Sequence, residues 1–300
     1  MNIKPLPTVL PLIVSIGLVS PVAAQQPVNF SVASEETNAQ ERINFSGKLR
    51  MLSQRIPSAA CHLDQGIDVD GATTLLIGAT AEFEKILTAL ENGDPELNII
   101  NPETNRRALM RIAALRAEWE PLKAAAEAII AENANADDVA FILNENLPVL
   151  SAAQLLVEQL VRQYSNPNDA TAASLMLIDI SGRQRMLTQK MSKESCMLDI
   201  AENTDVVLED LEGTMRIFEA SLEALQFGLP QVGILPPPNS AIATGLGEVG
   251  REWSVARPQL VNLMAGEVLD PDAQVVKFQA LNTTMATMNR VVGMYAEAAK

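Results

Sequence analysis

The chain has 300 residues, and its 37 acidic residues against 22 lysines and arginines give it a formal net charge of −15 at pH 7. This charge argues against nucleic acid as a partner, because binding phosphates requires a basic surface. Two cysteines and one histidine exclude a disulfide-dense scaffold, a c-type haem motif and a histidine-rich metal site, so we expect no metal and no cofactor.

The first 24 residues have the order of a signal peptide. A single charge at Lys4 is followed by an apolar run from Val9 to Val19 and by Val22-Ala23-Ala24, which predicts cleavage after Ala24. The alternative is an uncleaved anchor, but the run is about half of the ~20 residues that a span needs, and Pro11 interrupts it. We therefore expect export to the periplasm, with no membrane insertion after cleavage.

The rest of the chain is an internal repeat. A shift of 135 residues aligns Cys61 with Cys196 and Phe83 with Phe218, and the two tryptophans match at a shift of 134. The short polar turn at 165–168 contains a proline and discourages a helix. The repeat predicts two domains, at residues 25–165 and 166–300.

Apolar residues recur at helical spacing throughout both copies, and no run alternates with the period of a strand. The predicted helices cover, in chain order, residues 36–66, 71–92, 103–132, 137–164, 169–201, 204–227, 240–266 and 271–299. Long helices joined by short loops favour antiparallel neighbours. We predict an all-α fold of two tandem four-helix bundles, with Trp119 and Trp253 anchoring the two cores.

The first predicted helix of each copy carries the motif Gly-x-x-Arg-Met-Leu-x-Gln, at residues 47–54 and 182–189. At 100° per residue, the glycine, arginine, methionine and glutamine lie on one stripe, with a cysteine further along it, and leucines lie opposite. A glycine inside a helix costs about 1 kcal/mol relative to alanine, so its recurrence indicates close approach of another backbone. We therefore predict that the two motif helices pack together about a pseudo-twofold axis.

In that packing Arg50 faces Arg185, and the two guanidinium groups repel each other unless an anion lies between them. A planar oxyanion matches the fork of donors on each arginine, which predicts nitrate, nitrite or a small carboxylate as ligand. The alternative is that each arginine pairs with a carboxylate of the chain. No nucleophile with its base is recognised, so we expect no catalytic residue and no enzyme. The predicted ligand-binding residues are Arg50, Arg185, Gly47, Gly182, Gln54, Gln189, Met51 and Met186.

Cys61 and Cys196 lie 11 residues beyond the arginines on the same stripe, about 16 Å along a helix. If the motif helices run parallel, the cysteines are level and a disulfide can form. If they run antiparallel, the cysteines are about 33 Å apart and cannot bond. The other interpretation is two small buried hydrophobic residues. His62 beside Cys61 lacks a third metal ligand, so we interpret it as structural or exposed.

The segments INFSGKLRMLSQR (residues 43–55) and IDISGRQRMLTQK (178–190) resemble the PilJ-like domain, the N-terminal sensing domain of type IV pili methyl-accepting chemotaxis proteins. They are also similar to the nitrate-binding box of periplasmic domains in nitrate/nitrite sensor histidine kinases, where two chains each supply an arginine to one nitrate. By this resemblance, Arg50 and Arg185 would supply both halves of the site from one chain. Two departures imply unequal copies: Pro57 interrupts the first motif helix, and Asp179 replaces the asparagine found at Asn44.

The resemblance implies a periplasmic sensory or ligand-binding protein that reports to a membrane sensor, chemotaxis receptor or transporter. The alternative is an interaction module of a pilus, chemotaxis or envelope system that binds no ligand.

Overall fold

The computed structural model of the chain describes residues 38–132, 136–164, 170–198, 200–201 and 203–299. The predicted signal peptide at residues 1–24 and the predicted turn at 165–168 lie outside the described residues.

The described residues form helices α1 to α8 and two short 3-10 turns, and no strand is found among them. The all-α prediction is confirmed, and the helix ends fall within a few residues of the predicted ones. The helices are α1 (Ala39–Asp64), α2 (Val69–Asn92), α3 (Arg106–Ile130), α4 (Ala136–Tyr164), α5 (Ala170–Met197), α6 (Thr204–Phe227), α7 (Ser240–Met264) and α8 (Pro271–Ala298).

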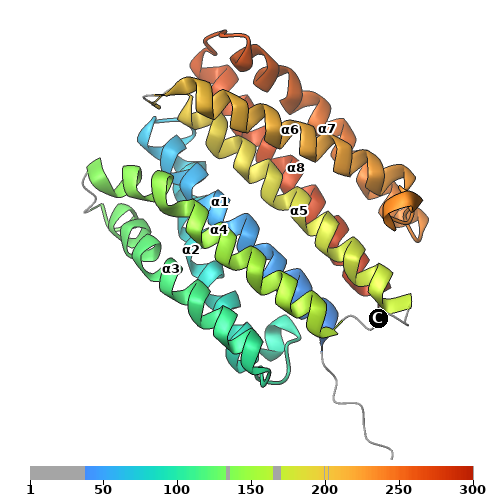
Figure 1. The fold of residues 1–300 in the computed structure, drawn as a ribbon. Coiled ribbons are helices and arrows are strands. Elements are labelled where there is room, and N and C mark those ends of the chain that lie inside the picture. Colours follow the sequence, from blue (N-terminus) through green and yellow to red (C-terminus); the bar gives the residue numbers. More distant parts are fainter. Residues whose placement is uncertain (1–37, 133–135, 165–169, 199, 202, 300) are drawn as a thin grey trace, which may run out of the picture. The chain divides into compact units, whose positions relative to one another are not determined.

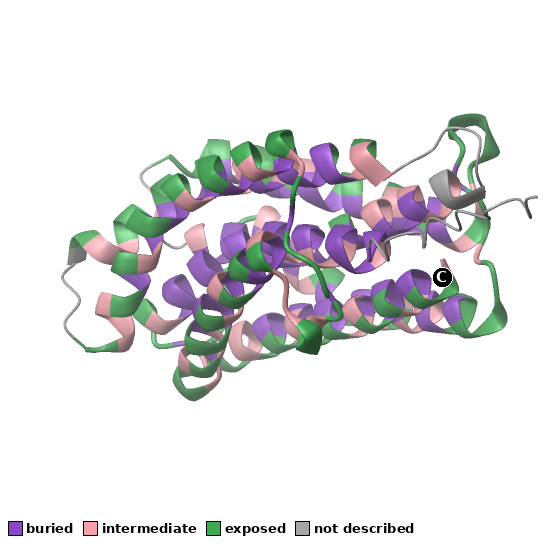
Figure 2. Cartoon of the chain, turned by 90° about the horizontal axis from the view of Figure 1, so that it is seen from below, coloured by how far each residue is buried: buried purple, intermediate pink, exposed green. Residues whose placement is uncertain are grey.

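Each copy of the repeat is a four-helix bundle, as predicted. In the first copy α1 contacts α2 and α4, and α3 closes the ring by contacting the same two helices. Helices α5 to α8 repeat this arrangement (Figure 1). The buried residues of the helices face inward (Figure 2), and one hydrophobic core continues through both bundles.

The most extensive helix contact in the described part of the chain joins α1 to α5. The two helices lie side by side between the bundles (Figure 1), and α8 makes a smaller contact with α1, where Gln40 Nε2 donates a hydrogen bond to the Ala299 carbonyl at 2.9 Å. The predicted pairing of the motif helices is therefore confirmed.

The repeat extends to the residues that end helices and anchor cores. Gly93 and Gly228 end α2 and α6 with φ values of 83° and 80°, which a glycine adopts without strain. Trp119 is fully buried and stacks on Phe83 with ring centroids 4.0 Å apart, and Trp253 packs against Phe218 in a tilted arrangement with centroids 4.8 Å apart. Both tryptophans are core anchors, as predicted.

The predicted interruption at Pro57 is not found, because α1 continues through this residue to Asp64. Proline has no N–H to donate to the carbonyl four residues earlier. That carbonyl belongs to Ser53, and it instead accepts a hydrogen bond from Gln54 Nε2 at 3.1 Å. A side chain of the motif thus replaces the missing backbone donor and keeps the helix intact.

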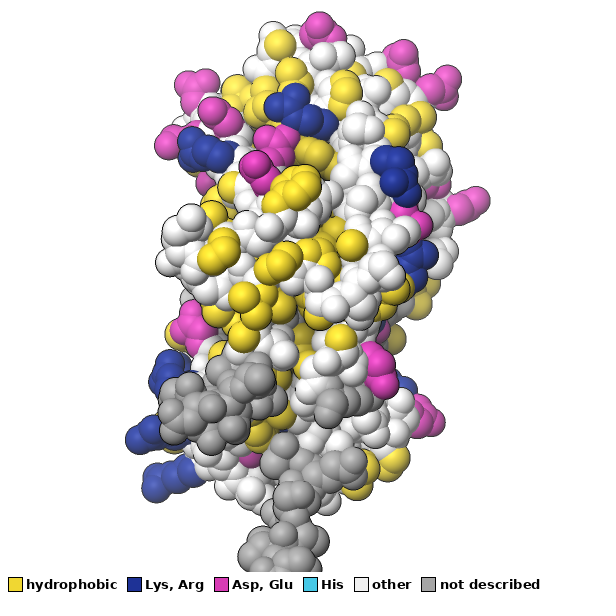
Figure 3. All heavy atoms as spheres, turned by 90° about the vertical axis from the view of Figure 1, so that its right-hand side faces the viewer, with side chains coloured by type: hydrophobic (Ala, Val, Ile, Leu, Met, Phe, Trp, Pro, Cys, Tyr) yellow, Lys and Arg dark blue, Asp and Glu magenta, His cyan; other side chains and the backbone are white. Residues whose placement is uncertain are grey.

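Among the described residues, α4 from Asp137 to Tyr164 is long and apolar enough to cross a membrane by length and composition alone. It packs on α1 and α3, and Val149 and Leu156 are fully buried in this contact. Other apolar residues of α4, among them Leu147 and Leu155, are exposed. On the face shown in Figure 3, most basic side chains lie apart among acidic and hydrophobic ones, and a small group of them gathers at the lower left edge.

Candidate functional site

The contact between α1 and α5 is lined by polar side chains, which we call the polar seam. Six of its residues, three from each motif helix, are at most 1 % exposed. Burial of so many polar groups is costly unless they bind one another. The buried members are Arg50, Gln54 and Ser58 of α1 and Arg185, Gln189 and Ser192 of α5, and the seam also includes Asn44 and Asp179 at one end.

The two arginines converge on the motif glycines. A Cβ atom placed on Gly47 would lie 3.2 Å from Nη2 of Arg50 and 3.4 Å from Nη2 of Arg185. On Gly182 it would lie 3.3 Å from Nη2 of Arg185 and 3.5 Å from that of Arg50. The sequence argument expected a backbone to approach these glycines, but the groups that fill the space are the guanidiniums themselves. A side chain at either glycine would therefore crowd both guanidinium groups.

Arg50 forms the ion pair that the alternative interpretation expected. Its Nη2 lies 2.7 Å from Oδ1 of Asp179, and its Nη1 donates to Oε1 of Gln154 on α4 at 2.8 Å. Burial lowers the pKa of Arg50, and the charge of Asp179 acts in the opposite direction. One of the two buried cations is thus neutralised within the chain.

Arg185 has only neutral partners among its described contacts. Its Nη1 donates to Oδ1 of Asn44 at 2.9 Å and to Oδ1 of Asn289 on α8 at 2.8 Å, and its Nη2 donates to the Asn44 carbonyl at 3.0 Å. Burial lowers the pKa of Arg185 to about 9, and the positive charge of Arg50 adds to this effect. The pair of arginines therefore has one carboxylate for two positive charges.

Donors also remain unused in this arrangement. Within the described part of the chain, Nε of Arg50 and Nε of Arg185 are buried and have no hydrogen-bond partner. Both side chains are closed off from solvent, at 0 % and 1 % exposure. A ligand that reaches the two arginines has to displace side chains of the seam.

The motif glutamines extend the polar seam away from the arginines. Gln54 Nε2 donates to Oδ1 of Asn146 at 3.1 Å, and the same oxygen accepts from Lys193 Nζ at 3.0 Å. Gln189 accepts from Arg55 Nε at 3.1 Å and donates to Oδ1 of Asn282 at 3.3 Å. The glutamines thus connect the seam to α4 and α8. No described hydrogen bond joins either of them to Arg50 or Arg185.

The motif methionines lie in the hydrophobic core. Met51 is fully buried there, and Met186 is partly buried against it. The structure brings neither into a described polar contact, and their ligand-binding role rests on the sequence alone.

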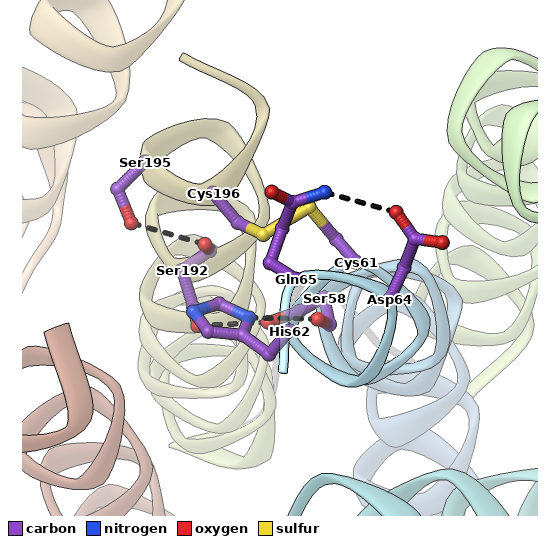
Figure 4. Close-up of a disulfide and its surroundings, with 8 residues drawn as sticks. All are labelled: Ser58, Cys61, His62, Asp64, Gln65, Ser192, Ser195 and Cys196. Carbon is purple, nitrogen blue, oxygen red and sulfur yellow. Dashed lines mark hydrogen bonds between the residues drawn. A yellow bond between two sulfur atoms is a disulfide. The ribbon is translucent and has the colours of Figure 1, made fainter. Parts of the chain in front are cut away.

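A disulfide joins Cys61 of α1 to Cys196 of α5 and ties the motif helices together at the end of the seam (Figure 4). One turn earlier, Ser58 Oγ donates to Ser192 Oγ at 2.7 Å. With the arginines level at one end and the cysteines at the other, the motif helices run parallel. This is the arrangement in which the sequence allowed a disulfide.

His62 beside the disulfide is buried and structural. Its ring stacks on Phe278 with centroids 4.0 Å apart, and Nδ1 lies 2.8 Å from the Ser58 carbonyl (Figure 4). Burial lowers the pKa of His62 to about 3, so the ring is neutral near pH 7. The described residues contain no group of three or more histidine, cysteine, aspartate or glutamate side chains that could hold a metal.

Sequence reasoning missed most partners of the arginines. Gln154 and Asn289 lie on the last helix of each bundle, and they are related by the same shift of 135 as the motifs. Continuing the alignment to these helices would have identified them. Asn44 and Asp179 were noticed as a difference between the copies, but not as the residues that bind the arginines.

Comparison with known proteins agrees with the duplicated fold and motif. The family model described as "Type IV pili methyl-accepting chemotaxis transducer N-term", PilJ, matches residues 32–143 and again residues 165–280. No curated protein matches the chain. The family represents a sensory, non-catalytic region of such transducers. The two matches cover most of the chain, which therefore belongs to the PilJ family of type IV pili methyl-accepting chemotaxis transducer N-terminal domains and carries two copies of this domain.

Proposed function

We propose that this chain is a periplasmic sensory module that binds a small planar monoanion between Arg50 and Arg185 and reports its presence to a membrane signalling partner. One observation carries this proposal: two buried guanidinium groups converge, and within the described residues only that of Arg50 forms an ion pair, with Asp179, which also pairs with Arg183. The sensory role rests on membership of the family, and nitrate or nitrite is the first ligand to test because of the motif's resemblance to a nitrate-binding box.

Charge balance favours an anion at this position. Removing an ion from water costs several kcal/mol, and a nearby opposite charge offsets this cost better than neutral amides do. Arg185 has only Asn44 and Asn289 as described partners. A monoanion would neutralise the remaining positive charge, and its coplanar oxygens suit the unused Nε donors of the two arginines.

Burial suggests how binding would become a signal. Because Arg50 and Arg185 are closed off from solvent, we infer that an entering anion displaces side chains of the seam and moves α1 relative to α5 at this end. The disulfide between Cys61 and Cys196, about three turns further along, fixes the other end. Ligand binding would therefore change the angle between the two bundles, a movement that a membrane partner could detect.

The test is thermal unfolding of the protein with nitrate, nitrite, formate, acetate and chloride at matched ionic strength. A ligand at 100 times its Kd that binds only the folded state adds about 2.7 kcal/mol to the free energy of unfolding. We expect a rise in Tm that is selective for nitrate or nitrite and is lost in an Arg50→Gln/Arg185→Gln variant. If no anion raises Tm above the chloride control, the anion site is refuted.

The second candidate is an interaction module without a ligand, and the Arg50–Asp179 ion pair is the observation that favours it. In that case the arginines stabilise the paired helices, and a pilus, chemotaxis or envelope component binds elsewhere on the surface. This candidate predicts that no anion raises Tm. It also predicts that the Arg50→Gln/Arg185→Gln variant still binds the partner.

A further inference from the structure

Arg55 and Lys190 occupy the same position in the two copies, one residue after the motif glutamine. Lys190 has an acidic partner on its own helix, Glu194, and its Nζ also donates to Oγ1 of Thr214 on α6 at 2.9 Å. In the second copy this partly buried cation is therefore neutralised by a carboxylate and further bound by a hydroxyl group.

The first copy has lost both partners. The residues equivalent to Glu194 and Thr214 are Ala59 and Ala79. The described hydrogen bond of Arg55 runs from Nε to Gln189 at 3.1 Å, and Arg55 has no ion pair within the described residues. The charge of Glu82 acts on Arg55, but this carboxylate forms an ion pair with Lys48.

An open pocket of about 400 Å³ lies beside Arg55 and Ala79, whereas Ala59 is buried in the core next to it. We call it the Arg55 pocket, and its walls include Arg55, Thr74, Leu75, Gly78, Ala79 and Glu82. Thr74 and Leu75 also line an adjoining pocket of about 700 Å³ between α2 and α8. Burial lowers the pKa of Arg55 to about 10, so the guanidinium is desolvated and still charged near pH 7.

We propose that the Arg55 pocket binds the carboxylate of a small organic acid, which would neutralise Arg55 as Glu194 neutralises Lys190. The rest of the acid extends past Thr74 into the larger pocket, where Leu75 and Ala286 offer an apolar surface and Asn282 an amide. This site is separate from the arginine pair, and it does not depend on an anion binding there.

The Arg55 pocket is connected to the polar seam by hydrogen bonds. Arg55 binds Gln189 of the second motif, and Gln189 binds Asn282, which also lines the larger pocket. A carboxylate that moves the Arg55 guanidinium further into the pocket would disturb its hydrogen bond to Gln189. Because Gln189 binds Asn282, the change would reach from α1 through α5 to α8. The ligand would thus contact both copies of the domain.

The experiment measures binding of acetate, propionate and glutarate by calorimetry, with acetamide as the uncharged control, to the full chain and to matched variants. Arg55→Gln should weaken carboxylate binding roughly tenfold to a hundredfold, as expected for loss of a charged hydrogen-bond partner. Ala59→Glu/Ala79→Thr reproduces the second copy, keeps Arg55 and should also abolish binding. Excess nitrate, the first ligand proposed for the arginine pair, should leave glutarate binding unchanged, which separates this site from the proposed anion site.

A second variant tests the same idea in reverse and does not rely on the first copy. Glu194→Ala empties the equivalent position beside Lys190, so acetate should raise the Tm of this variant more than that of the unmodified protein. The proposal is overturned if no carboxylate binds the unmodified chain more strongly than acetamide. It is also overturned if binding survives in both Arg55→Gln and Ala59→Glu/Ala79→Thr.

Discussion

Asp179 occupies, opposite Arg50, the position that Asn44 occupies opposite Arg185. Oδ1 of Asp179 lies 2.7 Å from Arg50 Nη2, and Oδ1 of Asn44 accepts a hydrogen bond from Arg185 Nη1 at 2.9 Å. Equivalent residues thus contact the two arginines, but only Asp179 brings a negative charge. This single difference decides how much positive charge is available to a ligand.

Asp179→Asn should therefore destabilise the protein and strengthen anion binding. Breaking a buried ion pair costs about 3–5 kcal/mol, and the loss should fall near the lower end because the Asp179 side chain is 16 % exposed. Urea unfolding with and without nitrate measures both effects, and nitrate should restore part of the lost stability. Asn44→Asp is the matched control: a second carboxylate should remove any nitrate effect. Equal nitrate responses in the two variants would contradict this account.

The disulfide should account for a large part of the stability of the paired bundles. It closes a loop of 135 residues between Cys61 and Cys196, for which the loss of chain entropy in the unfolded state predicts about 5 kcal/mol as an upper value. We expect the Cys61→Ser/Cys196→Ser variant to lose roughly 2–5 kcal/mol in urea unfolding, with its helix content preserved. A reducing agent should shift the unmodified protein to the same midpoint and leave the double variant unaffected.

Gln184→Leu should stabilise the protein. Gln184 is fully buried, and neither atom of its side-chain amide has a hydrogen-bond partner within the described residues. Its equivalent in the first copy is Leu49, which is also fully buried. Leaving a buried polar group unsatisfied costs about 1–3 kcal/mol, so leucine should raise the free energy of unfolding by that order.

The reciprocal change, Leu49→Gln, should lower the free energy of unfolding by a similar amount. Both variants are compared with the unmodified chain by urea unfolding. If Gln184→Leu proves less stable than the unmodified chain, Gln184 has a structural role that its contacts do not reveal.

The sequence was sufficient to predict the helices, the repeat and the pairing of α1 with α5, because these depend on periodicity and on matches at one fixed shift. It was also sufficient to predict that Arg50 and Arg185 lie together, because the helix stripes that carry them need a packing partner. It could not decide whether the arginines pair with a carboxylate of the chain, because this depends on where the neighbouring backbone places Asp179. The sequence did not reveal the Arg55 pocket, because the alanines at positions 59 and 79 are informative only once Glu194 and Thr214 are known to bind Lys190.

His62, the only histidine of the chain, should make stability depend on pH. Burial lowers its folded pKa from 6.5 to about 3, the charge of Lys277 on α8 adds to this effect, and the charge of Asp68 opposes it. In the unfolded chain the ring takes up a proton below about pH 6.5, whereas the folded ring stays neutral until about pH 3. The contribution of His62 is therefore fully present above pH 6.5 and is lost as pH falls toward 3, by an amount on the order of 4 kcal/mol.

The measurement is urea unfolding between pH 7.5 and pH 4 on the unmodified chain and on His62→Met, which carries the residue found at the equivalent position, Met197. Carboxylates titrate in both proteins, so the difference between the two pH profiles isolates the histidine. We expect the unmodified chain to lose stability more steeply below pH 6.5, because only its unfolded state gains an additional proton there. Parallel profiles would mean that the ring is protonated in the folded protein as well. The contact of Nδ1 with the Ser58 carbonyl would then have to stabilise an imidazolium despite the nearby positive charge of Lys277.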